Sequence, residues 1–153
     1  MAAEGEQAPS FEKATDGGGT LALGDLKGRK VVLYFYPKDD TPGCTKEAEG
    51  FRDAIADFDA AGASVVGVSK DSVARHDKFK AKYDLPFALV SDDDGSLCGA
   101  YGVWIEKKNY GRTYMGIERS TFLIDESGKI AKAWRKVRVK DHVAAVLEAT
   151  RNL

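Results

Sequence analysis

The chain has 153 residues, of which 43% are hydrophobic and 31% charged, and its formal net charge is −1. A chain of this length fits one domain, residues 1–153, and can bury a core without disulfide staples. So small a net charge gives no strong field to attract nucleic acid or an anionic membrane, and no apolar run reaches membrane-spanning length. The chain has only two cysteines, and its first ten residues lack the apolar core of a signal peptide. We therefore expect a cytoplasmic protein with reduced thiols.

The first predicted element is an N-terminal β-hairpin. Two short segments, Ser10–Ala14 and Thr20–Leu23, flank the glycine-rich stretch Asp16–Gly19. Such a stretch is typical of a turn. A phosphate-binding loop is the weaker interpretation because no lysine or helix start follows in the required register.

A strand–helix–strand unit comes next. The run Val31–Tyr36 is continuously apolar and aromatic, as in a strand buried on both faces of a sheet. Apolar side chains then recur at helical spacing from residue 42 to 61, and Gly62 closes this helix. A second buried strand, Ser64–Ser69, completes a right-handed crossover.

Strand and helix patterns continue to alternate through the second half of the chain. The predicted elements are a helix at Ser72–Tyr83, a strand at Phe87–Val90, a turn at Asp92–Gly95, a short helix at Ser96–Tyr101, hairpin strands at Arg119–Ile124 and Lys129–Trp134, and a closing helix at His142–Arg151. This order predicts an α/β fold with a central mixed β-sheet flanked by helices.

The segment Tyr36–Thr45 joins the carboxyl end of a buried strand to a helix start, where reactive groups collect in open α/β sheets. Thr41 followed by Pro42 is a helix-start signal, with threonine as the N-cap. Cys44 then lies in the first helical turn, among backbone N–H groups without helical partners. This position makes Cys44 a candidate nucleophile, although a lone cysteine is more often a small buried hydrophobe.

A helix start alone does not activate such a thiol. With a pKa of about 8.5, a free cysteine is only roughly 3% thiolate at pH 7. The helix dipole contributes about 0.3–1 kcal/mol and at best about 2, which lowers the pKa by roughly 0.2 to 1.5 units. Glu47 and Glu49 are close in sequence and oppose that shift. We therefore expect a cation beside Cys44, and arginine is the best candidate because it stays protonated.

The pattern Pro37-x-x-x-Thr41-x-x-Cys44 resembles the active-site motif of the peroxiredoxins. The fuller string from Phe35 to Thr45 is similar to the bacterioferritin comigratory protein, or peroxiredoxin Q, subfamily. Further segments that resemble this subfamily follow in order along nearly the whole chain: Ser69–Ser72 with His76 and Phe79, Leu85–Phe87, Ser91–Asp92, Tyr101–Trp104 and Arg119–Asp125.

The resemblance implies a thioredoxin-like fold and a thiol-dependent peroxidase that reduces hydrogen peroxide and alkyl hydroperoxides without metal or organic cofactor. It makes Cys44 the nucleophile that becomes a sulfenic acid, and Pro37 a shield of the pocket. It makes Thr41 a hydroxyl contact to thiolate and peroxide, and Arg119 the cation that lowers the pKa of Cys44 and holds the peroxide. Backbone N–H groups of Gly43 and Cys44 would stabilise the leaving oxygen.

The chain departs from the subfamily pattern at the resolving cysteine, the second thiol that condenses with the sulfenic acid. Glu49 occupies one common resolving position, and the predicted helix Ser72–Tyr83 contains no cysteine. Only Cys98 remains, in a small apolar helix where a buried structural role is the simpler interpretation. We therefore expect a one-cysteine mechanism resolved by an external thiol such as thioredoxin, glutaredoxin or glutathione. The alternative is a two-cysteine mechanism through Cys98. The resemblance also suggests a monomer or weak homodimer.

Two rival functions and one metal-site possibility are disfavoured. A thiol–disulfide oxidoreductase would need a cysteine where Thr41 stands. A non-catalytic binding or chaperone-like module would not need the complete set of Pro37, Thr41, Cys44 and Arg119. The two histidines, His76 and His142, have no cysteine or carboxylate at ligand spacing, so we expect no metal site and a packing role for His76.

Overall fold

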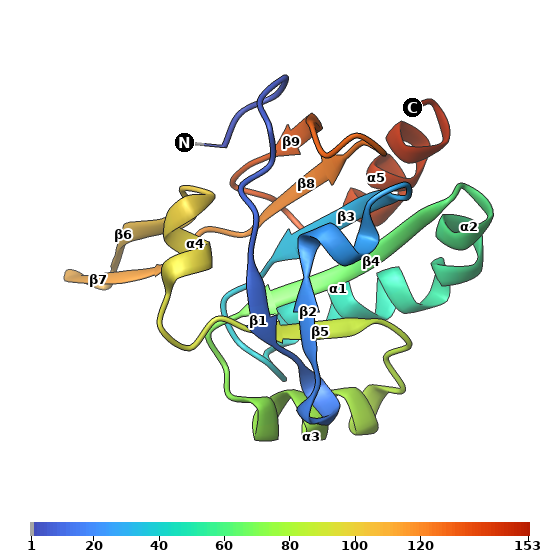
Figure 1. Cartoon of the computed structure of the whole chain (residues 1–153). Helices are drawn as coiled ribbons and strands as arrows, with labels where there is room; N and C mark the ends of the chain where they lie inside the picture. Colours follow the sequence, from blue (N-terminus) through green and yellow to red (C-terminus); the bar gives the residue numbers. More distant parts are fainter. Residues whose placement is uncertain (1) are drawn as a thin grey trace.

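The computed structural model describes residues 2–153 and builds them around a mixed β-sheet (Figure 1). Its strands lie in the order β5 (Ala88–Ser91), β4 (Ala63–Ser69), β3 (Lys30–Phe35), β8 (Ser120–Ile124) and β9 (Ile130–Trp134). β3, β4 and β5 run parallel, whereas β8 is antiparallel to β3, and β9 to β8. β3 is central and covered on both faces, which explains its continuous apolar sequence.

Helices and loops cover the two faces of the sheet with separate hydrophobic clusters. The helices are α1 (Pro42–Asp53), α2 (Ile55–Ala60), α3 (Val73–Tyr83), α4 (Ser96–Ala100) and α5 (His142–Arg151). Alternate residues of β3 point to opposite faces, so Leu33 packs in one cluster and Tyr34 in the other. The first cluster includes residues of α4, and the second includes residues of α1, α2, α3 and α5. No helix within residues 2–153 is long and apolar enough to cross a membrane.

Two hairpins form separate two-stranded sheets outside the five-stranded sheet. β1 (Glu12–Ala14) and β2 (Thr20–Ala22) form the predicted N-terminal hairpin, which crosses in front of the sheet in Figure 1. A second hairpin, β6 (Trp104–Asn109) and β7 (Arg112–Ile117), was not predicted. Its two-residue turn has positive φ at both Tyr110 (51°) and Gly111 (75°), the backbone of a tight hairpin turn.

The predicted helix over residues 42–61 is wrong in its continuity. Ala54 leaves helical geometry, with φ −100° and ψ 5°, and the chain restarts as α2. Phe51 and Phe58 still pack together across this break, with ring centroids 5.7 Å apart. Because both arrangements bury the same side chains, the hydrophobic periodicity does not reveal the break. The remaining predicted strands and helices are confirmed, with ends shifted by one or two residues.

Candidate active site

Cys44 is the third residue of α1, directly after the loop that follows β3. Thr41 is extended at the N-cap, with φ −101° and ψ 154°, and Pro42 takes the first helical position as predicted. The Thr41 hydroxyl makes no cap hydrogen bond to the helix, and it donates to the carbonyl of Lys38 at 2.8 Å. The Cys44 side chain is buried, with only 1% of its surface exposed. A thiol in the first turn at the carboxyl end of a central strand is therefore present as predicted.

Arg119 reaches Cys44 because β8 pairs with β3. The register places Ser120 opposite Phe35, so Arg119 lies beside the end of β3. Its Nη2 donates to Cys44 Sγ at 3.4 Å. A Cβ added to Gly43 would lie 3.2 Å from that same nitrogen, so the glycine leaves room for the guanidinium. The structure thus supplies a cation where the helix dipole alone was too weak.

Glu47 shares the guanidinium with Cys44. Arg119 Nη1 donates to Glu47 Oε1 at 2.7 Å, and the Glu47 side chain is fully buried. Burial raises the pKa of Glu47 to about 7, and Arg119 acts against that rise. Its Oε2 has no hydrogen-bond partner among the described residues. From their positions in the sequence, both Glu47 and Glu49 were expected to oppose the helix dipole at Cys44. In the structure only Glu47 pairs with Arg119, whereas Glu49 lies 3.8 Å from Arg52.

An open pocket of about 560 Å³ lies next to Arg119. The residues that line it include Pro37, Ile105, Lys107, Tyr114, Arg119 and Val137. Three of these come from the unpredicted β6–β7 hairpin. Pro37 and Arg119 therefore line the same pocket. The rest of its lining named here, apart from Val137, comes from β6 and β7, which were not predicted from the sequence.

Comparison with known proteins decides the family. The model of the AhpC/TSA family matches residues 5–133. A putative Bcp peroxiredoxin of Coxiella burnetii is 58% identical and covers 94% of this chain and 95% of its own. Peroxiredoxin Q of Xylella fastidiosa superposes with a TM-score of 0.95 at 40% identity, over 99% of this chain and 97% of its own. The bacterioferritin comigratory protein of Xanthomonas campestris, analysed for its alkyl peroxide reduction activity, gives a TM-score of 0.89 at 47% identity, over 93% and 90%.

The chain belongs to the AhpC/TSA family, as a Bcp-type peroxiredoxin. It is a thiol-dependent peroxidase with a thioredoxin-like fold, and it uses a peroxide substrate and a thiol reductant. The predicted family, fold and enzyme class are confirmed.

Cys98, the second cysteine of this peroxiredoxin, lies on the other side of the sheet. It packs in the cluster of Leu33, whereas Cys44 packs in the cluster of Tyr34. The Cys98 side chain is 0% exposed. Burial and the neighbouring carboxylate of Asp92 raise the pKa of the Cys98 thiol well above its usual range. The charges of Lys70 and Lys13 act in the opposite direction but do not outweigh burial and Asp92, so the thiol form is favoured.

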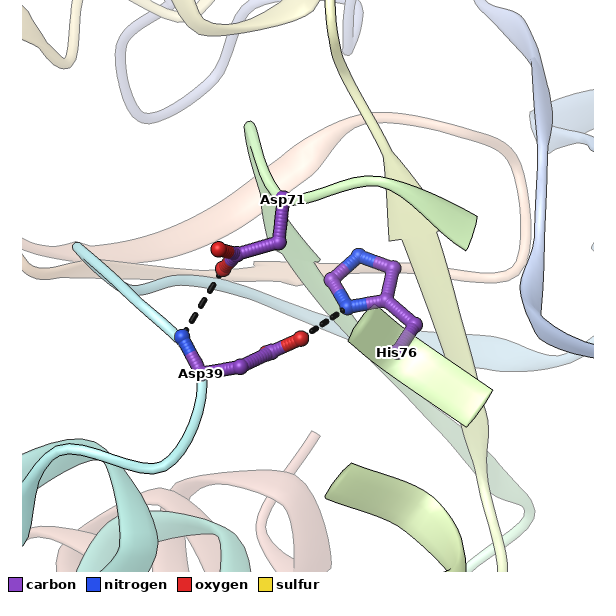
Figure 2. Close-up of side chains that lie close together, drawn as sticks. All are labelled: Asp39, Asp71 and His76. Atoms are coloured by element: carbon purple, nitrogen blue, oxygen red, sulfur yellow. Dashed lines mark hydrogen bonds and ion pairs between the residues drawn. The ribbon is translucent and has the colours of Figure 1, made fainter. Parts of the chain in front are cut away.

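A buried cluster of Asp39, Asp71 and His76 lies next to the peroxiredoxin motif (Figure 2). His76 comes from α3, and both of its ring nitrogens are hydrogen bonded, so its predicted packing role is confirmed. The sequence shows no carboxylate at ligand spacing from a histidine, but the fold brings Asp39 and Asp71 close to His76. One potential ligand atom from each residue lies within 4.8 Å of the others, but these groups are bonded to one another or to neighbouring protein groups.

Proposed function

We propose that Cys44 is the peroxidatic nucleophile and that the enzyme reduces hydrogen peroxide and alkyl hydroperoxides. The observation that carries this proposal is the 3.4 Å contact between Arg119 Nη2 and the buried Cys44 Sγ at the start of α1. A guanidinium favours the thiolate over the thiol. The alkyl substrates are supported by the activity described for the Xanthomonas campestris relative and by Ile105 and Val137 on the pocket wall.

The reaction follows from the groups around Cys44. The thiolate attacks the terminal oxygen of ROOH, an S–O bond forms and the O–O bond breaks. The attacked oxygen keeps its hydrogen as Cys44 sulfenic acid, and the leaving RO⁻ takes a proton from water. Arg119 and the backbone N–H groups of Gly43 and Cys44 stabilise the charge on the leaving oxygen.

Thr41 and Pro37 orient and protect the peroxide in this proposal. The Thr41 hydroxyl spends its hydrogen on the Lys38 carbonyl. Its oxygen is then free to accept a hydrogen bond from the peroxide O–H, since a hydroxyl has one donor and two acceptor lone pairs. Pro37 lines the pocket and has no N–H to offer a competing donor.

We further propose a one-cysteine mechanism with an external thiol. That thiol condenses with the sulfenic acid to a mixed disulfide and water, and a second thiol then releases Cys44 in its reduced form. The buried position of Cys98 on the opposite face of the sheet supports this version over an internal disulfide. Thioredoxin, glutaredoxin and glutathione are candidate reductants for a cytoplasmic monomer or weak homodimer.

One experiment tests both proposals. Reduced protein receives one equivalent of hydrogen peroxide without reductant, and both cysteines are then mapped by mass spectrometry with a sulfenic-acid trap. We expect trapped sulfenic acid at Cys44 and a free thiol at Cys98. A Cys44–Cys98 disulfide as the main product would overturn the one-cysteine mechanism. Oxidation of Cys98 alone would overturn the assignment of the nucleophile.

A further inference from the structure

The loop between β3 and α1 is held by α3. This loop carries Pro37 and Thr41 and leads into Cys44, so its conformation sets where these groups lie. Asp40, within the loop, has a positive φ of 57°, a strained conformation for a residue with a side chain. Such a backbone persists only where surrounding contacts fix it.

Two neighbouring aspartates make those contacts. Asp40 accepts hydrogen bonds from Lys82 Nζ at 2.8 Å and Tyr83 Oη at 2.7 Å, both on the exposed end of α3. Asp39 is buried and lies 2.6 Å from His76 Nδ1, further back on the same helix. Exposed ion pairs contribute little, whereas buried charge-assisted hydrogen bonds are strong and specific in geometry. The His76 contact is therefore the principal anchor.

His76 is clamped between two acceptors. Its Nδ1 faces the Asp39 carboxylate, and its Nε2 lies 2.9 Å from the carbonyl oxygen of Val90 in β5. A neutral imidazole has a proton on only one nitrogen, so one of these contacts would set a lone pair against an oxygen. With Asp39 ionised, both contacts are satisfied only by the doubly protonated imidazolium.

The charges around the ring favour this protonated form. Burial lowers the pKa of His76, but the hydrogen bond and charge of Asp39, the hydrogen bond to Val90 and the charge of Asp71 together raise it above its ordinary value. Asp39 also accepts from Tyr36 Oη at 2.5 Å, and its own N–H donates to Asp71 at 2.8 Å. Arg75, 3.5 Å from Asp71, supplies the other nearby charge on α3.

We propose that the His76 imidazolium is a positioning residue for the peroxidase reaction, because it fixes the Asp39 end of the loop that carries Thr41 toward Cys44. The inference rests on the proposed role of Cys44. Arg119 directly precedes β8, on the other side of β3 from β4, and its guanidinium contacts Glu47 and Cys44 rather than α3. Loss of the His76 anchor therefore shifts the loop relative to Arg119, and a misplacement of about 1 Å can cost about 100-fold in rate.

Two matched substitutions separate positioning from stability. In asparagine the amide nitrogen is as many bonds from Cβ as Nδ1 is, so His76→Asn keeps a donor for Asp39. In glutamine it matches Nε2, so His76→Gln keeps a donor for Val90 and leaves Asp39 without one. We expect kcat/KM for hydrogen peroxide to fall roughly 10- to 100-fold in His76→Gln and less than about 5-fold in His76→Asn. Equal losses in both variants would overturn the proposal.

The exposed contact on the same helix provides the control. Lys82→Gln removes one charge from the Asp40 pair without touching the buried ring, and we expect less than about a 2-fold change in kcat/KM. Thermal unfolding of all three variants measures any general loss of stability. A larger loss of kcat/KM in Lys82→Gln than in His76→Gln would contradict the assignment of the principal anchor.

The wild-type enzyme tests the protonation state without any variant. Nitrogen NMR of the two histidines at pH 7 should show one imidazolium, His76, and one neutral ring, His142, whose pKa burial lowers to about 4. A neutral His76 would overturn the proposal. kcat/KM should also decline over the pH range in which His76 loses its proton, and the decline should vanish in His76→Asn. A decline that persists in His76→Asn likewise contradicts it.

The two proposals fail separately. If peroxide does not oxidise Cys44 in the wild-type protein, the proposed nucleophile is wrong. If peroxide oxidises Cys44 as fast in His76→Gln as in the wild type, the nucleophile stands and the positioning role of His76 is wrong.

Discussion

Cys44 and Cys98 both lie at the third position of a helix, and neither side chain is more than 1% exposed. Beside Cys44 the Arg119 guanidinium lies 3.4 Å from the sulfur. Beside Cys98 lies the carboxylate of Asp92, which accepts from the N–H groups of Leu97 and Cys98 at 3.0 and 2.8 Å and pairs with Lys13 at 3.0 Å. The free N–H groups at the start of α4 are therefore already bonded to the carboxylate of Asp92. The comparison teaches that two equally buried thiols at helix starts can differ in the group that contacts them, a guanidinium at Cys44 and a carboxylate at Cys98.

Serine substitution at each cysteine gives the largest expected difference between the two regions. Cys44→Ser should abolish peroxidase activity, with a loss of more than about 10³-fold in kcat/KM, because no other residue supplies the nucleophile. Cys98→Ser should keep activity within about 3-fold, since Cys98 lies in the other hydrophobic cluster. Steady-state peroxide consumption with an external thiol measures both. A loss in Cys98→Ser as large as that in Cys44→Ser would show that the second thiol takes part in turnover.

Removal of the guanidinium tests the charge that distinguishes the two sites. Arg119→Ala should raise the pKa of Cys44 and reduce kcat/KM by about 10²–10³-fold, the usual effect of removing one donor to a developing oxyanion. Arg119→Lys is the matched control, because it keeps the positive charge but loses the two-armed geometry. The pH dependence of thiol alkylation reports the pKa of Cys44, and stopped-flow peroxide kinetics report the rate. An unchanged pKa in Arg119→Ala would show that another group activates the thiol.

The fold could be predicted from the sequence because its signals are local. Continuous apolar runs predict β3 and β4, and the adjacent residues Thr41 and Pro42 predict the start of α1. The β6–β7 hairpin was missed because its strands are partly exposed and carry no clear alternation of apolar and polar residues. Only the dipeptide Tyr110–Gly111, with its glycine at a positive-φ turn position, could have indicated it.

The site was predicted in part, and the division has a physical cause. Cys44 and Thr41 lie in one short segment, so a motif finds them together. Arg119 reaches them only through the antiparallel register of β8 with β3, so its role was assigned from the family resemblance rather than from spacing. His76 and Asp39 are 37 residues apart and meet because β3 and β4, the strands that precede them, run parallel side by side. No local sequence pattern predicts this pair.

Glu47 gives the next largest expected effect, this time on stability. Its pKa of about 7 in the folded protein lies above the ordinary value of 4.5, so the folded state binds more protons than the unfolded state between these values. Its contribution is thus full below about pH 4.5 and is lost as the pH rises through about 7. Glu47→Gln should remove this loss, a difference on the order of 3 kcal/mol between pH 4.5 and 8.

Urea unfolding of both proteins across this pH range measures the Glu47 effect. His76 and His142 titrate in the wild type and in Glu47→Gln alike, so their contributions cancel in the difference between the two curves. The result would contradict the assignment if the two curves stay parallel. A difference between the two curves would also show that the carboxylate beside Cys44 can be neutralised by one proton.

Asp92→Asn gives the smallest expected effect and isolates the helix start itself. The amide keeps one acceptor for the N–H groups of α4 but removes the negative charge, so the pKa of Cys98 should fall. Lys70 and Lys13 lower the pKa of Cys98 by less than burial raises it, and a short helix contributes at most about 0.3–1 kcal/mol, which is less than one pKa unit. Alkylation of Cys98 under native conditions should therefore stay far slower than that of Cys44, while the unfolding free energy drops by about 1–2 kcal/mol. Peroxidase activity shows whether Asp92→Asn also disturbs the Cys44 site, and it should change less than about 2-fold. If Cys98 instead became as reactive as Cys44, a helix start without a contacting guanidinium would be enough to activate a buried thiol. Arg119 would then no longer explain the difference between the two cysteines.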